Sequence, residues 1–290
     1  MPSPLVRQTL CHRDCSLSWF VGGDGPPLVM IQGAGVGGTG WRPQVEALSG
    51  EFRCLCYDNR GFGESPWPKG DLTLELMAED LLALMDAQGW ESAHLMGHSM
   101  GGLIALYAAH KARARVRSLS LLCTFASGAV PSRLTPWLLG VGLRSRIGTR
   151  RMRRHAFLEM VLAPGELAQA DRDALAERLG DLFGHDLADQ PPVVLRQIGA
   201  MRRADATPFL AGMGGIPSLV ISATHDRMAP PFAGRVLAEG IPGARYVELP
   251  DAAHGVPITH ADRVNALLRE HLKGAEAAWR PQPRAGTGAP

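Results

Sequence analysis

The sequence predicts an α/β fold: a mostly parallel sheet, flanked by helices, that carries one helical insertion. Short apolar runs alternate along the chain with segments of helical periodicity, as in parallel strands joined by covering helices. Two glycine-rich stretches, at 32–38 and 97–102, each follow such an apolar run directly. The strand signals stop between 124 and 208 and then return, which indicates the insertion.

The expected strands are short, and most of them are largely apolar, as buried parallel strands are. They are Leu28–Ile31, Phe52–Tyr57, Ala93–Met96, Val116–Cys123, Ser218–Ser222 and Arg245–Leu249. The residues before Val21 are expected to pair as antiparallel strands at one edge of the sheet.

The expected helices have apolar residues at helical spacing. The first is Leu72–Gln88, which Gly89 ends as a natural stop. The second covers 103–112, directly after the second glycine-rich stretch, and the last is the amphipathic segment Ala261–Leu272.

These elements divide the chain into a core, an insertion and a tail. Residues 1–123 and 209–273 are expected to form the α/β core, and 124–208 a helical lid. The lid is expected to consist of short helices broken at Gly140, Gly148, Pro164–Gly165, Gly184 and Pro191–Pro192. An insertion at this point lies over the carboxyl ends of the strands, where open α/β sheets bind ligands. The remaining residues, 274–290, are rich in Gly, Pro and Ala and are expected to be disordered.

Composition limits the class of protein and its partners. Of 290 residues, 46% are hydrophobic and 20% are charged, which favours a large buried core over a disordered chain. The net charge of +2 gives no overall signature of a nucleic-acid or membrane partner, so a small-molecule partner is expected. The five scattered cysteines do not suggest a disulfide framework. With no secretory signal at the start and no apolar run long enough to span a bilayer, a cytoplasmic location is expected.

The sharpest local motif is the sequence GHSMG at 97–101, which has the form GxSxG and is followed by a third glycine. It lies between an expected strand and an expected helix, the setting of a nucleophile elbow, where small residues let the backbone turn around an exposed serine. A plain glycine-rich turn is the alternative. Ser99 is therefore the candidate nucleophile.

A nucleophilic serine needs a base, and the base needs a carboxylate that orients it. Asp226 follows the strand Ser218–Ser222, and His254 follows the strand Arg245–Leu249. Because parallel strands end at one edge of a sheet, we expect Ser99, Asp226 and His254 to meet there as nucleophile, acid and base.

Three other histidines compete for the role of base. His260 lies near the start of the last helix and is expected to face solvent. His98 adjoins the nucleophile, but adjacent residues in a tight turn point apart. His225 adjoins the candidate acid and would compete only if that loop were turned over.

With these residues the chain resembles the α/β-hydrolase superfamily, in its helical-lid branch of esterases, lactonases and C–C hydrolases. The resemblance runs from about Leu28 to Leu272 and implies the α/β-hydrolase fold. YDNRGFGES at 57–65 resembles the DxRGxGxS loop, IQGAGV at 31–36 the HGxG oxyanion loop, and LVISATHDRMAP at 219–230 the acid loop.

The resemblance also implies roles for single residues. Asp58 and Arg60 are expected to be structural. The backbone N–H groups of Ala34 and Met100 are expected to form the oxyanion hole. Gln32 stands where the family has a histidine, but because backbone groups hold the anion, its presence need not abolish the hole.

The expected activity is hydrolysis of a small to medium, largely apolar carboxylic ester or lactone through an acyl-enzyme on Ser99, with no cofactor and no metal. One alternative is C–C bond or thioester hydrolysis by the same three residues. Another is a catalytically silent member of this fold that serves as a receptor or scaffold.

Two further features have a structural and a functional interpretation. Cys54 and Cys56 are expected to point into the core, since no second ligand pair completes a metal site. The segment 144–154 contains six arginines, which are compatible with a surface that binds phosphate or acids. A solvated outer face of the lid is the favoured interpretation of this segment.

Overall fold

The computed structural model describes residues 7–67, 70–130 and 135–280. Within them, one sheet has the strand order β1-β2-β4-β3-β5-β6-β7-β8. The strands are β1 (Arg7–His12), β2 (Cys15–Gly22), β3 (Pro27–Ile31), β4 (Arg53–Tyr57), β5 (Ala93–His98), β6 (Val116–Leu122), β7 (Ser218–Ala223) and β8 (Arg245–Leu249). Strands β3 to β8 are parallel, and β1 and β2 are antiparallel at one edge. The expected mostly parallel sheet with an antiparallel edge is confirmed.

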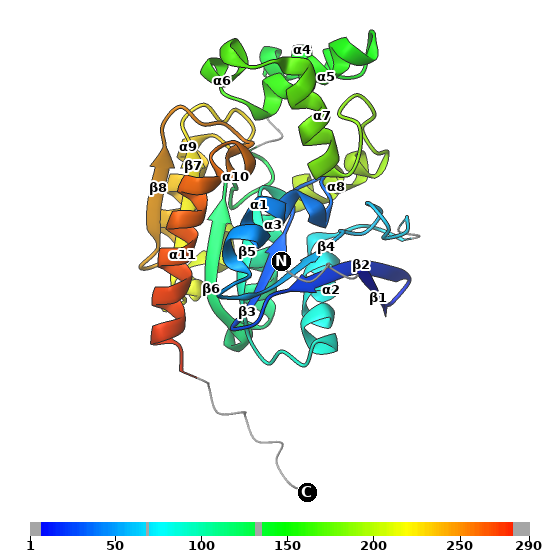
Figure 1. Cartoon of the computed structure of the whole chain (residues 1–290). Coiled ribbons are helices and arrows are strands. Elements are labelled where there is room, and N and C mark those ends of the chain that lie inside the picture. Colours follow the sequence, from blue (N-terminus) through cyan, green and yellow to red (C-terminus); the bar gives the residue numbers. More distant parts are fainter. Residues whose placement is uncertain (1–6, 68–69, 131–134, 281–290) are drawn as a thin grey trace, which may run out of the picture.

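Helices cover both faces of this sheet (Figure 1). The core helices are α1 (Arg42–Leu48), α2 (Leu74–Ala87), α3 (Met100–Lys111), α9 (Pro231–Gly240), α10 (Val256–Thr259) and α11 (Ala261–Ala278), with 3₁₀ turns η1 (Gly38–Trp41), η2 (Arg113–Arg115) and η3 (Thr207–Met213). Helices α1 and α11 pack together on one face, while α2, α3 and α9 lie on the other. Strands β5 and β7 are therefore buried along their whole length, which explains their unbroken apolar runs.

The helical insertion lies between β6 and β7 in the sequence and above the carboxyl ends of the strands, at the top of Figure 1. It contains α4 (Pro136–Arg144), α5 (Arg150–Val161), α6 (Pro164–Gln169), α7 (Arg172–Phe183) and α8 (Val193–Arg203). It has a small hydrophobic core of its own, made by Leu158, Val161, Leu162, Ala176, Leu179, Leu182, Phe183 and Leu187. The insertion is thus a packed unit rather than a single flap.

Most of the expected breaks in the insertion lie at helix ends. Gly148 precedes α5, Pro164 begins α6, Gly184 ends α7 in a left-handed conformation, and Pro192 precedes α8. The expected break at Gly140 is wrong, because this residue lies inside α4. A glycine in an exposed helix costs only about 1 kcal/mol relative to alanine, so the neighbouring residues continue the helix through it.

Helix α11 extends further than expected. The sequence predicted its end at Leu272 and disorder from 274 onward, but the helix continues to Ala278. Ala275 is buried against the core, and Glu276 forms an ion pair with Arg117 and a hydrogen bond with His94 Nε2, so this last segment is held to the sheet. The part of the tail beyond residue 280 lies outside the described residues.

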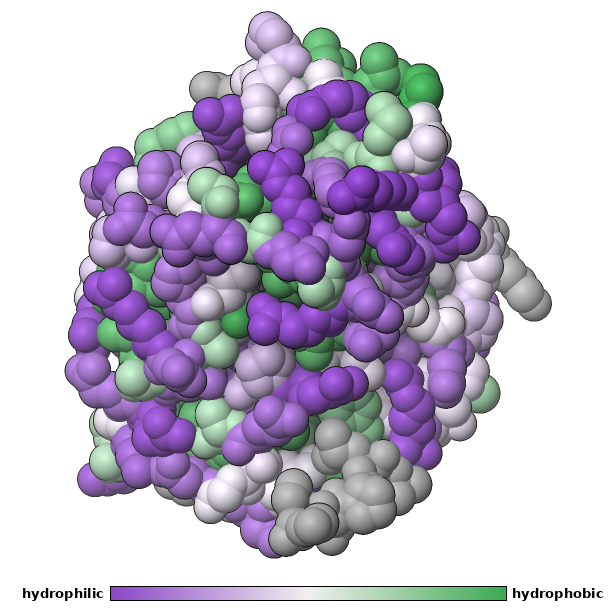
Figure 2. Space-filling model, turned by 45° about the horizontal axis from the view of Figure 1, so that its top comes forward, coloured by the Kyte–Doolittle hydropathy of each residue, from purple (hydrophilic) through white to green (hydrophobic). Residues whose placement is uncertain are grey.

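The insertion exposes an apolar outer face. Large exposed side chains on or near α4 are Leu139, Leu143, Ile147 and Met152. Figure 2 shows hydrophobic surface at the top of the molecule, while most of the rest of this view is hydrophilic. Among the described residues, no helix has the length and hydropathy needed to span a membrane.

Candidate active site

Ser99 occupies a sharp turn between β5 and α3. Its backbone has φ 53° and ψ −121°, a conformation that residues with a side chain rarely adopt. The turn requires glycine on both sides. A Cβ atom at Gly97 would lie 2.3 Å from the carbonyl oxygen of Gly101, and one at Gly101 would lie 2.1 Å from that of Ile31. Since Ser99 is partly exposed and both its sequence neighbours are buried, the local geometry is that of a nucleophile elbow.

Asp226 and His254 form a buried hydrogen-bonded pair at the ends of β7 and β8. Nδ1–H of His254 donates to Asp226 Oδ2 over 2.7 Å. The other carboxylate oxygen, Oδ1, accepts the backbone N–H groups of Met228 and Ala229, each at 2.8 Å. Because an ionised carboxylate only accepts, this contact assigns the proton of the neutral imidazole to Nδ1. Nε2 of His254 is then available to accept a proton.

Ser99 and His254 belong to neighbouring loops at this edge of the sheet. The residue before Ser99 contacts His254 directly, with ring centroids of His98 and His254 4.7 Å apart. The hydrogen bonds of the described residues do not include one between the Ser99 hydroxyl and His254. In free enzymes such catalytic contacts are often long and shorten when substrate binds.

His98 holds the backbone of His254, a role that the sequence analysis missed. Its Nε2–H donates to the carbonyl oxygen of His254 over 2.9 Å. Burial, with the electrostatic effect of the adjacent His254 ring as the second cause, lowers the pKa of His98 to about 3, so the ring of His98 is neutral. The side chain therefore neither competes for the acid nor points into solvent. The available signal in the sequence is that His98 directly precedes Ser99. The expectation that its side chain points away from the site is wrong.

Cys123, directly after β6, completes the surroundings of the acid. Its Sγ, a carboxylate oxygen of Asp226 and a ring nitrogen of His254 all lie within 4.8 Å of one another. Burial, followed by the charge of Asp226, raises the pKa of the Cys123 thiol well above its usual value. These residue types can ligate a metal, but a thiol ligand must be deprotonated. Cys123 is therefore a protonated, neutral thiol beside Asp226.

The loop after β3 passes beside Ser99. A Cβ atom at Gly33 would lie 3.1 Å from Ser99 Cβ. The Gly33 N–H donates to the Gln32 side-chain oxygen over 3.3 Å, and the Gly35 N–H donates to Gln197 Oε1 over 3.0 Å. Between them, the N–H of Ala34 donates no hydrogen bond to any of the described residues.

Met100 supplies a second free donor next to Ser99. It is the first residue of α3, and the first N–H groups of a helix have no partner within the helix. Its N–H and that of Ala34 thus lie on the two segments that flank Ser99. The side chain of Gln32, which stands where the family has histidine, is turned back onto its own loop.

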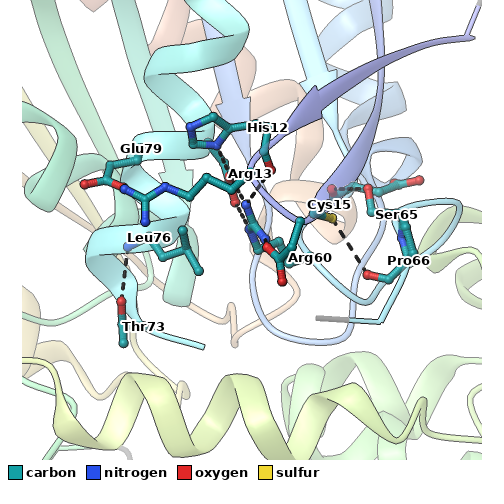
Figure 3. Close-up of polar contacts among 12 residues, drawn as sticks. His12, Arg13, Cys15, Arg60, Ser65, Pro66, Thr73, Leu76 and Glu79 are labelled. Atoms are coloured by element: carbon teal, nitrogen blue, oxygen red, sulfur yellow. Dashed lines mark hydrogen bonds and ion pairs between the residues drawn. The ribbon is translucent and has the colours of Figure 1, made fainter. Parts of the chain in front are cut away.

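Asp58 and Arg60 support this region rather than entering it. Asp58 Oδ1 accepts the Gly38 N–H over 2.8 Å, which anchors the end of the loop after β3. Arg60 is fully buried and binds Asp80 through Nε and Nη2, at 2.5 and 2.8 Å (Figure 3). Both side chains are therefore used in ion pairs and turn contacts.

The rival histidines have other neighbours. The His225 side chain is 44% exposed and lies 3.9 Å from Asp251. His260 Nδ1 contacts the Thr259 hydroxyl at 2.9 Å and lies 3.7 Å from Glu166. Of the four candidate histidines, the partner of Asp226 is therefore His254.

The arginine-rich segment of the insertion is largely paired within the insertion. Five of its six arginines contact acidic residues, in the pairs Arg144–Glu159, Arg150–Asp186, Arg151–Asp173, Arg153–Asp189 and Arg154–Asp186. These contacts lower the pKa of Asp186, with the Arg154 hydrogen bond as the largest cause. The charge is thus mostly balanced inside the insertion. Cys54 and Cys56 are both buried in β4.

Known proteins resemble the chain over most of its length. A protein of Azorhizobium caulinodans named "Putative carbamate hydrolase RutD" is 30% identical over 264 residues, which cover 88% of this chain and 94% of the relative. The structure of the enol-lactonase from Burkholderia xenovorans LB400 has 31% identity and a TM-score of 0.78, and the match covers 92% of this chain and 100% of that one. A thermophilic esterase from Thermogutta terrifontis has 27% identity and a TM-score of 0.75, covering 94% and 99%.

A family model described as the alpha/beta hydrolase fold matches residues 26–261, from the start of β3 to the start of α11. The match includes the serine turn, the two loops that carry Asp226 and His254, and the whole insertion. The resemblance noted in the sequence is thereby confirmed: the chain belongs to the alpha/beta hydrolase fold family.

Proposed function

We propose that this protein is a serine hydrolase that cleaves a small to medium, largely apolar carboxylic ester or lactone. The observation that carries the proposal is the 2.7 Å hydrogen bond between His254 and Asp226, at the sheet edge where Ser99 stands in its strained turn. A carboxylate that orients an imidazole near an accessible serine is the arrangement that acyl transfer needs. The names of two relatives, an enol-lactonase and an esterase, favour an ester or lactone substrate.

The first half of the reaction forms an acyl-enzyme. Nε2 of His254 accepts the proton of the Ser99 hydroxyl while Oγ attacks the substrate carbonyl carbon. Asp226 stabilises the imidazolium and keeps the proton on Nδ1. His254 then donates its new proton to the leaving alkoxide oxygen, the C–O bond breaks, and the acyl group remains on Ser99.

The second half returns the enzyme to its starting state. His254 accepts a proton from water, which attacks the acyl carbon, and then returns that proton to Ser99 as the carboxylic acid leaves. In both halves the negative oxygen of the tetrahedral intermediate is met by the backbone N–H groups of Ala34 and Met100. Removal of one such donor typically lowers kcat by a factor of about 10²–10³.

A second candidate is hydrolysis of a carbamate by the same residues. The likeness to proteins named RutD favours it. A carbamate differs from a carboxylic ester in that its carbonyl carbon bears a nitrogen atom. Attack at that carbon needs the same nucleophile and base, so Ser99, Asp226 and His254 would keep their roles.

The proposal is tested by labelling with a fluorophosphonate probe, which reacts with activated serines. We expect the wild-type protein to be labelled and Ser99→Ala not to be. Ser120→Ala is the matched control, because Ser120 is fully buried in β6 and its hydroxyl has no partner among the described residues. Labelling that persists in Ser99→Ala would remove Ser99 as the nucleophile.

The bond that is cleaved is tested with a substrate panel. It contains short-chain and long-chain p-nitrophenyl esters, lactones, a thioester, an aryl carbamate and a meta-cleavage diketone. We expect the highest kcat/KM on an ester or lactone, with loss of at least about 10³-fold in Ser99→Ala. If the highest kcat/KM is found on the diketone, the protein is a C–C bond hydrolase. A protein that shows neither labelling nor turnover would be a silent member of the fold.

A further inference from the structure

The helical insertion is hydrogen-bonded to the loop that carries Ala34. The Gly35 N–H donates to Gln197 Oε1 over 3.0 Å, and Nε2 of His185 lies 3.0 Å from the Gly35 carbonyl oxygen. Two more bonds follow along the loop, from the Gly37 N–H to the Phe183 carbonyl at 3.2 Å and from the Thr39 hydroxyl to the Leu182 carbonyl at 2.9 Å. Residues from α7 to α8 therefore hold the segment 35–39 from above.

Gln197 is the buried polar side chain at the centre of this contact. It lies on α8 and is fully buried. Because Oε1 accepts the Gly35 N–H, its amide is oriented with Nε2 toward the Arg60 carbonyl, 3.4 Å away. The side chain thus joins the oxyanion loop to the loop at 57–65. Neither an apolar nor a solely accepting side chain of this size makes both contacts.

We infer that Gln197 is a positioning residue for the oxyanion hole. This inference rests on the proposed function. Gln197 accepts a hydrogen bond from the N–H of Gly35, the next donor along the loop. The N–H of Ala34 therefore stays available to bind the oxyanion. Since the peptide group is planar, fixing the Gly35 N–H also fixes the Ala34 carbonyl of the same peptide unit. The Ala34 N–H belongs to the preceding peptide unit, and only the φ and ψ torsions of Ala34 separate it from the unit that Gln197 holds. Gln197 on the insertion therefore constrains the path of the loop on which the Ala34 donor lies.

The geometry around Gly35 leaves little room for another arrangement. Gly35 has φ +75°, and a Cβ atom on it would lie 2.9 Å from Val194 Cγ2 on the same helix as Gln197. The backbone of the loop at Gly35 therefore packs directly against α8 of the insertion. Donors of an oxyanion hole work because they are oriented before the charge develops, so loss of this support lowers kcat more than it raises KM.

The test compares Gln197→Leu with the wild-type protein on the best ester of the panel. We expect kcat to fall about 10–100-fold with KM changed less than about threefold, since a displaced donor costs less than a deleted one. The rate constant for fluorophosphonate labelling is expected to fall by a similar factor, because the phosphoryl oxygen occupies the same hole. Gln197→Glu keeps an acceptor for the Gly35 N–H and is expected to retain more activity than Gln197→Leu.

Ser145→Ala is the matched control within the insertion. Ser145 is buried, but its hydroxyl donates to the Gly142 carbonyl within α4, away from the oxyanion loop. We expect wild-type kcat for it. Should Gln197→Leu not fold, Gln197→Asn, whose amide is one methylene too short, is measured instead with the same expected loss.

Three results would overturn the inference. They are wild-type kcat in the Gln197 variants, an equal loss in Ser145→Ala, and a rise in KM at unchanged kcat. Failure of the proposed function has a different signature, because the wild-type protein itself would then be neither labelled nor active.

Discussion

Two His–Asp pairs with buried carboxylates lie in different regions of the described structure, and they differ in what else reaches the carboxylate. His12 Nδ1 lies 2.6 Å from Asp80 Oδ1 at the antiparallel edge of the sheet. His254 Nδ1 lies 2.7 Å from Asp226 Oδ2 at the carboxyl ends of the parallel strands. Distance and burial alone do not distinguish a structural pair from a candidate catalytic one.

The counter-charge distinguishes them. Asp80 receives two hydrogen bonds from the buried guanidinium of Arg60, which Figure 3 shows beside His12. Among the described residues, the hydrogen-bond donors that reach Asp226 besides His254 are two backbone N–H groups, which are neutral. The negative charge of Asp80 is thus balanced by a permanent cation, while that of Asp226 is available to stabilise an imidazolium that forms during a reaction. A carboxylate held by neutral donors is the better partner for a catalytic base.

The largest expected effect separates the two histidines. We expect His254→Ala to lower kcat/KM on the best ester at least about 10³-fold, since it removes the proton acceptor of Ser99. His12→Ala is expected to stay within about threefold of wild type. His260→Ala, which leaves the Asp226 pair intact, should also remain active. Steady-state kinetics check all three, and a deep loss in His260→Ala would move the base to that position.

The second effect separates the two carboxylates. Asp226→Asn is expected to lower kcat about 10²–10⁴-fold with folding intact, because the base loses its orientation. Asp80→Asn leaves the buried Arg60 without its main counter-charge and is expected to reduce the free energy of unfolding by about 3–5 kcal/mol. Urea unfolding and kinetics on the folded fraction distinguish these outcomes. Normal turnover in Asp226→Asn would contradict the proposed acid.

The smallest effect concerns His98, whose buried ring contacts a carbonyl rather than a carboxylate. Its pKa is about 3 in the folded protein, against about 6.5 for a histidine in an unfolded chain. The unfolded state therefore binds the proton first, and the stability that this histidine contributes is complete above about pH 6.5 and declines as the pH falls toward 3.

This linkage is measured by urea unfolding between pH 7 and pH 4. One such proton lowers the free energy of unfolding by at most about 1.4 kcal/mol per pH unit in this window. His98→Gln removes that proton from the balance, so its stability is expected to fall less steeply with acid than that of the wild type. Parallel pH profiles of the two proteins would contradict a neutral His98.

The fold and the central residues were predictable because their signals are local. Strands β3 to β7 are almost wholly buried and hence appear as largely apolar runs, while the edge strand β8 is only partly buried. Ser99, Asp226 and His254 each follow a strand that ends at the same edge of the sheet. The hydrogen bond from His254 to Asp226 is the pairing that the strand order had indicated.

The supporting residues were not predictable, since each acts through contacts that are distant in sequence. Gln197 contacts the backbone of Gly35 across 162 positions, and His98 contacts the carbonyl of His254 across 156. A glutamine in a helix and a histidine beside a serine look no different from residues that face solvent. The extension of α11 was missed for the same reason, because an ion pair and a hydrogen bond with the sheet, rather than helical periodicity, hold its last turn.

The four polar contacts between the insertion and segment 35–39 also define what can be exchanged between relatives. A chimera that receives a foreign insertion to change its substrate preference would lose the anchors on α7 and α8 and, with them, the support of its own loop after β3. The smallest part of the protein that can be transplanted therefore consists of two segments that are separate in the sequence. It comprises the segment from α7 to α8 together with residues 33–39, and these two pieces have to be grafted from the same donor.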